Sequence, residues 1–410
     1  MTAPAMITVE EHLAHVLDTV APLPSQTLPL AEALGATLGE DAAGRHDIPV
    51  FDNSGMDGYA VRGVDVATAS TSSPMTLRVV ADIPAGSPED PPLAPGEAAR
   101  IMTGAPLPTD ADAIVPVEQT VGGGWSDSPE VVVLDAPLPG AHVRRAAADL
   151  AEGDTVLSAG ERLTPRHLAA AAAAGITELV VRRAPRVAII STGTELVAPG
   201  RPLARGQIPE SNSVLLAGLV AETDARVASV ETVPDDADAL RAALGRAEHI
   251  ADLVVLSGGV SVGAYDVVKE VLAGTVDTVS VAMQPGKPQA FGVLAGGTPV
   301  FGLPGNPVSV AVSFEVFVRP ALLRMLGRDR VIRPEQDAIV AMGWRTPPGR
   351  RQYMPVAIDH TDGALSISPA TRGGSGSHLA GGLARAHGYA VVAADVDEVR
   401  PGDVLPVMLV

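Results

Sequence analysis

The chain has 410 residues, of which 46% are hydrophobic and 19% charged, which is enough apolar material for several cores and is not the composition of a disordered protein. Its formal net charge of -19 argues against a nucleic-acid partner or an anionic membrane, because such surfaces are held by clustered Lys and Arg. The chain contains no cysteine, no signal-peptide pattern at its start and no run of about 18 apolar residues, so we expect a cytoplasmic protein without disulfides or membrane insertion.

Two helices are predicted in the segments that flank the first β-rich region. Thr8 and Glu11 have the spacing of a capping box, and the apolar residues that follow recur with a helical period. Thr164 and the proline after it open a second helix, whose alanine run closes at a glycine. We interpret residues 1–47 and 145–183 as one discontinuous helical linker domain.

The spacing of hydrophobic residues divides the rest of the chain into three regions. Residues 48–144 hold short alternating runs separated by Pro, Gly and Asp, which predict a β-rich domain. Over residues 184–328 strands alternate with helices, which predicts a doubly wound, mostly parallel sheet covered on both faces. Residues 329–410 return to short strands and predict a small β-barrel-like domain. The expected class is therefore α/β multidomain.

Three loops of the α/β domain each follow an apolar strand: STGTEL, SGGVSVGAYD and GLPGNPV. Ligands of such sheets bind beyond the carboxyl ends of the strands, so all three loops should line one rim. The only two lysines of the chain, Lys269 and Lys287, lie in the same stretch. Glycine-rich turns present backbone N–H donors to phosphate-like groups, so we expect this rim to bind an anion.

Two of these loops contain the strongest local signals. Asn306 and Pro307 are favoured at the first positions of a helix, and Gly305 allows close approach of the backbone, although an ordinary helix start explains them about equally well. The turn that begins at Ser257 has glycines that fit a ligand-facing loop and hydroxyls that can donate to anion oxygens. Asp266, which begins the next helix, is by itself more readily explained as a capping group.

Carboxylates occupy several other loops, at Asp57, Asp149, Glu195 and Asp235. Acids beside an anion site make chemical sense when Mg2+ bridges them to phosphate oxygens, because Mg2+ prefers a few carboxylates together with substrate oxygens and water. Each residue taken alone is more simply a turn or cap residue. Their spacing in the sequence does not identify any one of them as a functional residue.

The motifs together resemble one known family, the MoeA molybdopterin molybdenumtransferases and the C-terminal part of gephyrin. They occur in the same order over nearly the whole chain: FDNSGMDGYAVR, IPAG, RIMTGAPLP, STGTEL, GQIPESN, SGGVSVGAYD, PGKP and GLPGNPVS. The resemblance implies a MogA-like α/β domain that binds molybdopterin, and Mg2+-dependent insertion of molybdate into adenylylated molybdopterin with release of AMP. It also implies a homodimer, with the linker domain in dimerisation, and a substrate supplied by an upstream molybdopterin adenylyltransferase.

The resemblance places functional residues at Asp57, Thr103, Glu195, Asp235, Asp266, Lys287, Pro304 and Pro307. Combined with the loop patterns, it predicts a catalytic set of Asp57, Asp149, Glu195, Asp235, Asp266 and Lys287. The predicted binding set is Thr103, Ser257, Gly258, Gly259, Ser261, Lys269, Gln284, Pro304, Gly305, Asn306 and Pro307. For Lys269 an ion pair on its own helix is as good an explanation as substrate contact. The leading candidates for holding Mg2+ are Asp57 and Asp266, with Asp57 implied to reach the site from the second subunit.

The chain departs from the family pattern at Ala147, Ala148 and Gln284. Many members have Gly-Glu before Asp149 and Lys at position 284, and replacing a cation by glutamine removes a charge-assisted hydrogen bond typically worth about 1.5–3 kcal/mol. These departures leave room for a catalytically reduced paralogue that acts as a gephyrin-like dimeric scaffold for a partner protein. A third reading is a protein that binds molybdopterin or a nucleotide without transfer chemistry.

Overall fold

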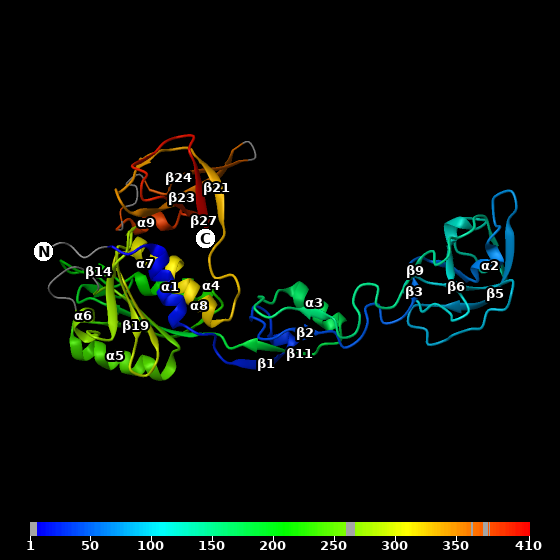
Figure 1. Cartoon of the computed structure of the whole chain (residues 1–410), viewed down its shortest axis with the longest axis horizontal. Coiled ribbons are helices and arrows are strands. Elements are labelled where there is room, and N and C mark those ends of the chain that lie inside the picture. Colours follow the sequence, from blue (N-terminus) through cyan, green and yellow to red (C-terminus); the bar gives the residue numbers. More distant parts are fainter. Residues whose placement is uncertain (1–5, 260–266, 362–363, 372–375, 377) are drawn as a thin grey trace.

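The computed structural model describes residues 6–259, 267–361, 364–371, 376 and 378–410. The molecule is elongated (Figure 1), with an α/β part and a C-terminal barrel at one end, a β-rich part at the other and a narrow linker between them. No helix in the described ranges is both long and apolar enough to cross a bilayer.

The α/β part is built on a six-stranded sheet with the order β15-β12-β16-β20-β19-β17. Four strands run parallel: β12 (Arg186–Thr192), β15 (Arg226–Val233), β16 (Leu253–Ser257) and β20 (Pro299–Leu303). At the edge, β19 (Pro288–Val293) and β17 (Val276–Ser280) are antiparallel. The sheet is therefore mostly parallel, as the strand and helix alternation predicted.

Helices cover both faces of this sheet. Alternate residues of β12 enter different cores, Val187 and Ile189 on one face and Ala188 and Ile190 on the other, which explains why the strand is apolar throughout. The first face is covered by α4 (Asn212–Glu222) and α7 (Pro307–Ser313), and the second by α5 (Ala237–Ile250) and α6 (Val267–Val271). This confirms the doubly wound arrangement.

The last helix of the α/β part is long and contacts the helix at the start of the chain. Helix α7 continues through a π-helical turn, η3 (Phe314–Val318), into α8 (Arg319–Met325). Helix α1 (Val9–Thr19) begins with the predicted capping box and packs against α8. Although residues 1–47 were expected in the linker, α1 buries its apolar stripe in the α/β core.

The C-terminal part is a closed five-stranded barrel with the order β23-β24-β21-β27-β25, completed by pairing of β25 with β23. Its strands are β21 (Glu335–Val340), β23 (Arg351–Thr361), β24 (Ala364–Pro369), β25 (Gly388–Val392) and β27 (Val404–Leu409), with β22 (Trp344–Arg345), β26 (Glu398–Val399) and helix α9 (Ala380–Leu383) beside it. The predicted barrel-like fold is confirmed. Tyr353, Tyr389 and Met408 of the barrel share one apolar core with Phe314 and Phe317, so barrel and α/β part form a single packed body.

The linker is a small unit with its own core. Two antiparallel pairs form it, β1 (Ser25–Pro29) with β11 (Glu178–Arg182) and β2 (Ala42–Ala43) with β10 (Thr155–Leu157), beside a short 3-10 turn, η1 (Leu30–Glu32). Helix α3 (Pro165–Ala173) is capped by the Thr164 hydroxyl, and Gly175 follows it at φ 77°, as the sequence predicted.

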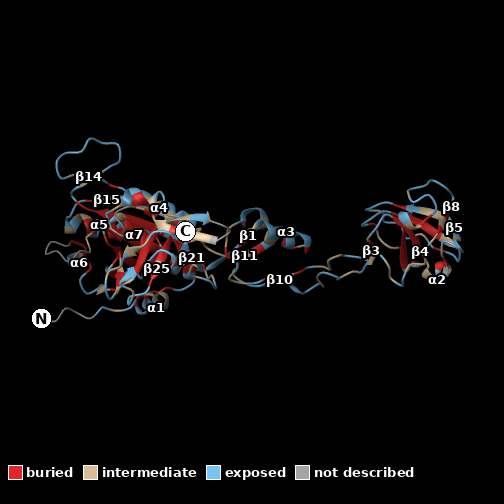
Figure 2. Cartoon of the chain, turned by 90° about the horizontal axis from the view of Figure 1, so that it is seen from above, coloured by how far each residue is buried: buried red, intermediate tan, exposed pale blue. Residues whose placement is uncertain are grey.

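The β-rich part is separately cored, because its two apolar clusters contain only residues between 59 and 143. A five-stranded sheet has the order β7-β4-β6-β5-β8. The strands are β4 (Gly58–Val61), β5 (Met75–Ile83), β6 (Glu97–Ile101), β7 (Ala113–Pro116) and β8 (Glu130–Val133), flanked by β3 (Asn53–Ser54), β9 (Val143–Arg144), α2 (Gly63–Val66) and η2 (Val117–Gln119). Figure 2 shows buried residues in the two end bodies and in the linker unit, whereas none of residues 45–52 or 143–156, which connect the linker to the β-rich part, is buried.

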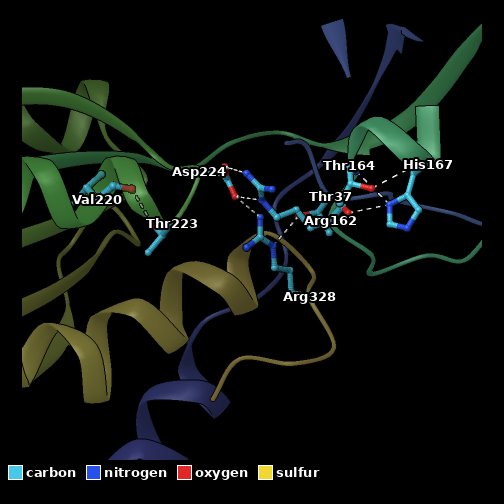
Figure 3. A network of polar contacts seen from close by, with 8 residues as sticks. All are labelled: Thr37, Arg162, Thr164, His167, Val220, Thr223, Asp224 and Arg328. Carbon is cyan, nitrogen blue, oxygen red and sulfur yellow. Dashed lines mark hydrogen bonds and ion pairs between the residues drawn. The ribbon is translucent and has the colours of Figure 1, made fainter. Parts of the chain in front are cut away.

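A cluster of charged groups joins the linker to the α/β part (Figure 3). Asp224 accepts hydrogen bonds from Arg162 of the linker at 2.7 and 2.8 Å and from Arg328, just beyond α8, at 2.6 Å. Arg328 also donates to the Thr37 hydroxyl at 3.1 Å. Burial alone would raise the pKa of Asp224, but the two guanidinium groups outweigh it and lower that pKa. We refer to these four residues as the Asp224 clamp.

The segment that returns from the β-rich part to the linker contains an unfavourable backbone conformation. Ala147 has φ 58°, in the left-handed region that costs a residue with a side chain roughly 1–2 kcal/mol. We expect Ala147→Gly to raise the free energy of unfolding by about 0.5 kcal/mol, because strain relief exceeds the added entropy of the unfolded chain. Calorimetric melting measures this difference. Ala148→Gly, at a position without positive φ, is the matched control and should destabilise; equal destabilisation by both variants would contradict the assignment of strain.

Candidate functional site

A cavity of about 600 Å³ opens at the carboxyl ends of β12, β16 and β20. Its lining comes from six segments: Thr192, Gly193, Glu195 and Leu196; Ile208, Pro209, Glu210, Ser211 and Asn212; Asp235; Ser257, Gly258 and Gly259; Gln284, Pro285, Gly286, Lys287 and Pro288; and Pro304, Gly305, Asn306, Pro307 and Ser309. The three loops expected at one rim thus meet in one cavity. Parallel strands bring them together because all their carboxyl ends lie on the same side of the sheet.

Close packing of the first two loops explains the glycine at position 258. Its φ is 93°, and a side-chain carbon there would lie only 2.6 Å from the main-chain oxygen of Thr192. A side chain would therefore both strain the turn and separate the loops after β12 and β16. The turn brings backbone close to the space that a ligand would fill.

The cavity carries more acid than base. Three carboxylates line it, at Glu195, Glu210 and Asp235, whereas Lys287 is the one cation among the described lining residues. One oxygen of Asp235 is already engaged, since it accepts hydrogen bonds from the main-chain N–H and the hydroxyl of Thr194 at 3.0 and 3.3 Å. An anionic ligand would therefore depend strongly on Lys287.

Glu210 is a buried carboxylate that sequence reasoning missed. It is 4% exposed and accepts hydrogen bonds from the hydroxyl of Ser191 at 3.0 Å and the main-chain N–H of Ser213 at 2.9 Å. The motif GQIPESN contains it, but a glutamate just before a helix reads as an ordinary terminus. Only its burial on the floor of the cavity separates it from such a residue.

Two buried polar atoms at the cavity lack a hydrogen-bond partner in the described part of the chain, Thr192 Oγ1 and Asn212 Oδ1. The orientation of the Asn212 amide is fixed, because its nitrogen donates to the Gly305 carbonyl at 2.8 Å. An unsatisfied buried group costs about 1–3 kcal/mol, so such groups are uncommon unless a ligand or water completes them. Their place on this wall supports a polar ligand.

Gln284 is held by a cation that the sequence did not connect to it. Strand β18 (Met283–Gln284) pairs in parallel with the start of β23, which attaches this side of the cavity to the barrel. The Gln284 side-chain oxygen accepts a hydrogen bond from Arg350 at 2.9 Å. A guanidinium therefore stands beside the position where many family members have lysine.

Several predicted residues lie away from the cavity. Asp57 and Thr103 are neighbours in the β-rich part, where one Asp57 oxygen accepts bonds from the Thr103 N–H at 2.8 Å and hydroxyl at 3.0 Å. Asp149 is exposed in the segment that returns to the linker, and its N–H donates to the Ile48 carbonyl. Lys269 is half-buried on α6 and does not line the cavity.

Two further predicted residues, Ser261 and Asp266, lie outside the described residues. Among the residues that are described, no group of three or more His, Cys, Asp or Glu side chains is placed to hold a metal ion. A magnesium ion that takes one or two carboxylates and otherwise substrate oxygens and water does not need such a group.

Comparison with known proteins gives matches along the whole chain. Residues 7–175 match the MoeA N-terminal region (domains I and II), residues 188–324 a probable molybdopterin binding domain, and residues 337–410 the MoeA C-terminal region (domain IV). A Mycobacterium tuberculosis protein named molybdopterin molybdenumtransferase 2 is 45% identical over 98% of this chain and 99% of its own length. The Haemophilus influenzae molybdopterin molybdenumtransferase is 34% identical, over 98% of both chains.

The fold is shared with solved structures as well. The crystal structure of a molybdopterin biosynthesis MoeA protein from Pyrococcus horikoshii superposes with a TM-score of 0.84 at 28% identity. The superposition covers 99% of this chain and 100% of that one.

Proposed function

This chain belongs to the MoeA family, and from that premise we propose that it is a molybdopterin molybdenumtransferase, an enzyme of molybdenum cofactor biosynthesis. One observation carries the proposal: every residue that lines the cavity falls within 188–324, the range that matches a probable molybdopterin binding domain. The relatives that match over nearly their full length bear the name of the same activity.

The reaction we propose is insertion of molybdate into adenylylated molybdopterin with release of AMP. Lys287 would hold the phosphate groups, since it is the cation on a wall that otherwise carries carboxylates. The glycine turn at Gly258 would let the substrate approach main-chain N–H groups. Asp235, fixed by two bonds from Thr194, would keep its remaining oxygen in a defined position beside them.

The carboxylate of Asp57 supports a role in binding magnesium. Asp57 accepts both hydrogen bonds from Thr103 on one oxygen, so its other oxygen makes no hydrogen bond within the described residues. We propose that Asp57 and Asp266, together with substrate phosphate oxygens, hold Mg2+, which would supply positive charge against those oxygens. The role of Thr103 would be to orient the Asp57 carboxylate.

The separation of Asp57 from the cavity supports a shared site. The β-rich part that carries Asp57 has its own core and stands at the opposite end of the molecule from the α/β part (Figure 1). We propose a homodimer in which the β-rich part of one subunit reaches the cavity of the other. A two-fold dimer would then contain two equivalent sites, each made from both chains.

The substrate would be supplied in the cytoplasm by an upstream molybdopterin adenylyltransferase. A gephyrin-like scaffold without catalysis is not favoured, because the cavity and its lysine are retained and the matched relatives carry the name of the enzyme. Although Gln284 itself carries no charge, a positive charge remains beside it, since Arg350 donates to its side-chain oxygen.

The test is molybdate-dependent AMP release from adenylylated molybdopterin by the purified protein with Mg2+. Release should require both the protein and molybdate. Release that does not exceed a protein-free control would overturn the proposed activity.

Lys287 gives a sharper test of how the cavity is used. Lys287→Met keeps the length of the side chain and removes its charge, so we expect transfer to fall roughly 10- to 100-fold, as for the loss of one charge-assisted hydrogen bond. Lys287→Arg keeps the charge and should retain more activity. The measurement is kcat/KM for AMP release, and equal rates for the Met variant and the wild type would show that no anion binds there.

A further inference from the structure

We propose that buried Glu210 sets the direction of hydrogen bonding along Ser191 and Ser257, so that Ser257 offers the cavity only a hydrogen-bond acceptor. The inference rests on the proposed function and deepens it, because it places the N–H-bearing edge of the pterin at Ser257 and leaves the anionic groups to Lys287. Glu210 and Ser191 are thereby positioning residues, which act on the substrate through Ser257.

Glu210 is a buried carboxylate, and burying such a group is costly unless hydrogen bonds or a cation compensate for it. It lies between β14 (Ile208–Pro209), which pairs with β13 (Leu196–Val197), and the start of α4, and in the described part of the chain it forms no ion pair. Its oxygens receive three donors, the Ser191 hydroxyl and both the N–H and the hydroxyl of Ser213. The Ser213 contacts alone would make Glu210 a cap for α4. The contact with Ser191 is different, because it connects Glu210 to Ser257, which lines the cavity.

The number of hydroxyl protons decides which group donates and which accepts in the contacts from Glu210 to Ser191 and Ser257. An ionised carboxylate can only accept, so the single hydroxyl proton of Ser191 is donated to Glu210 at 3.0 Å. Ser191 also lies 3.1 Å from the Ser257 hydroxyl, and with its own proton committed it must accept there, so Ser257 donates. The one proton of Ser257 is then used as well. What Ser257 presents to the cavity that it lines is a lone pair.

A lone pair at this position selects among the groups of the substrate. Phosphate and molybdate oxygens are acceptors and find no partner in Ser257, whereas the amino and ring N–H groups of a pterin are donors. Asn212 adds a second acceptor on the same wall, because its fixed amide leaves Oδ1 without a partner in the described residues. Donor groups of the ligand satisfy both atoms. The sequence pattern had suggested the opposite use, hydroxyls of this loop that donate to anions.

The direction can be reversed by one substitution. Glutamine would not reverse it, because the oxygen that accepts from Ser191 also accepts from the Ser213 N–H and would stay an oxygen in the amide. Glu210→Ala removes this acceptor, which frees the Ser191 proton for Ser257 and the Ser257 proton for the cavity. We expect the dissociation constant for 6-hydroxymethylpterin, a neutral pterin probe measured by its fluorescence, to rise at least tenfold. Ser257→Ala should weaken binding similarly, and adding Glu210→Ala to it should have little further effect, because both act through the same hydroxyl.

Two variants separate this role from that of a helix cap. Ser213→Ala weakens the cap and leaves the Ser191 contact, so pterin binding should stay within about twofold while the melting temperature falls. Ser191→Ala leaves the cap and removes the link between Glu210 and Ser257, so it should weaken pterin binding, and it serves as the test if Glu210→Ala does not fold. Wild-type binding of the pterin in a folded Glu210→Ala or Ser191→Ala protein would overturn the inference alone. Failure of the wild-type protein to bind the probe would overturn pterin binding itself, and with it the proposed function.

Discussion

Asp57→Asn is expected to reduce molybdenum transfer at least 100-fold while leaving the protein folded. Asparagine keeps the shape of the side chain and the oxygen that accepts both Thr103 bonds, so the loop in the β-rich part has no reason to change. It loses the negative charge that we assign to magnesium binding, and removing a direct ligand of a catalytic ion costs several kcal/mol of transition-state stabilisation. The measurement is molybdate-dependent AMP release, accompanied by a melting curve.

The same variant tests the shared site when it is mixed with Lys287→Met. Random exchange of subunits would make about half of the dimers mixed, each with one site that carries both substitutions and one that carries neither, so roughly a quarter of wild-type activity should return. Each variant incubated alone under the same conditions is the control. A mixture that exchanges subunits and gains nothing over either variant would place Asp57 and Lys287 in the same site of one chain, or Asp57 outside any site.

Glu315→Ala is expected to lower the free energy of unfolding of the α/β and barrel body by about 3–5 kcal/mol, because it leaves buried positive charge without its partner. Glu315 lies in the π-helical turn, is 3% exposed and accepts bonds from Arg333 at 2.6 and 3.2 Å. Arg319 lies 3.9 Å from the same carboxylate. Burial lowers the pKa of Arg319, and the nearby charge of Arg333 lowers it further, so loss of Glu315 would leave two guanidinium groups facing each other.

Calorimetric unfolding can measure this loss against an exposed ion pair. Asp238 is 94% exposed in its side chain and lies 2.9 Å from Arg241 on α5. Asp238→Ala should cost less than about 1 kcal/mol, as is usual for a solvated pair. If Glu315→Ala costs no more than Asp238→Ala, the buried cluster does not hold the barrel to the α/β part.

The elements that the sequence predicted well are those whose signals are local. The Thr8 cap, the Thr164 cap and the glycine after α3 depend on residues a few positions apart, and each is formed as expected. The cavity was predictable too, because parallel strands must end on one edge, so loops after apolar runs meet there.

What escaped the sequence depends on contacts between distant segments. Glu210 is distinguished only by the burial that the packed sheet imposes, and Arg350 reaches Gln284 only because β18 pairs with the barrel. The helix that follows Thr8 has a stripe typical of any amphipathic helix, so its period does not reveal which core it joins. No pattern along one chain could show that Asp57 and the cavity stand at opposite ends of the molecule.

The position of the Asp224 clamp affects how the β-rich part is oriented relative to the α/β part. The clamp fixes the linker to the α/β part through Arg162 and Arg328, while Asp57, between β3 and β4, belongs to the β-rich part at the other end of the molecule. Because the molecule is elongated, a small change of angle at the clamp would move the β-rich part much further than it moves the clamp residues themselves. In the homodimer that we propose, residues remote from both the cavity and Asp57 would therefore help to set how closely Asp57 approaches the cavity of the other subunit.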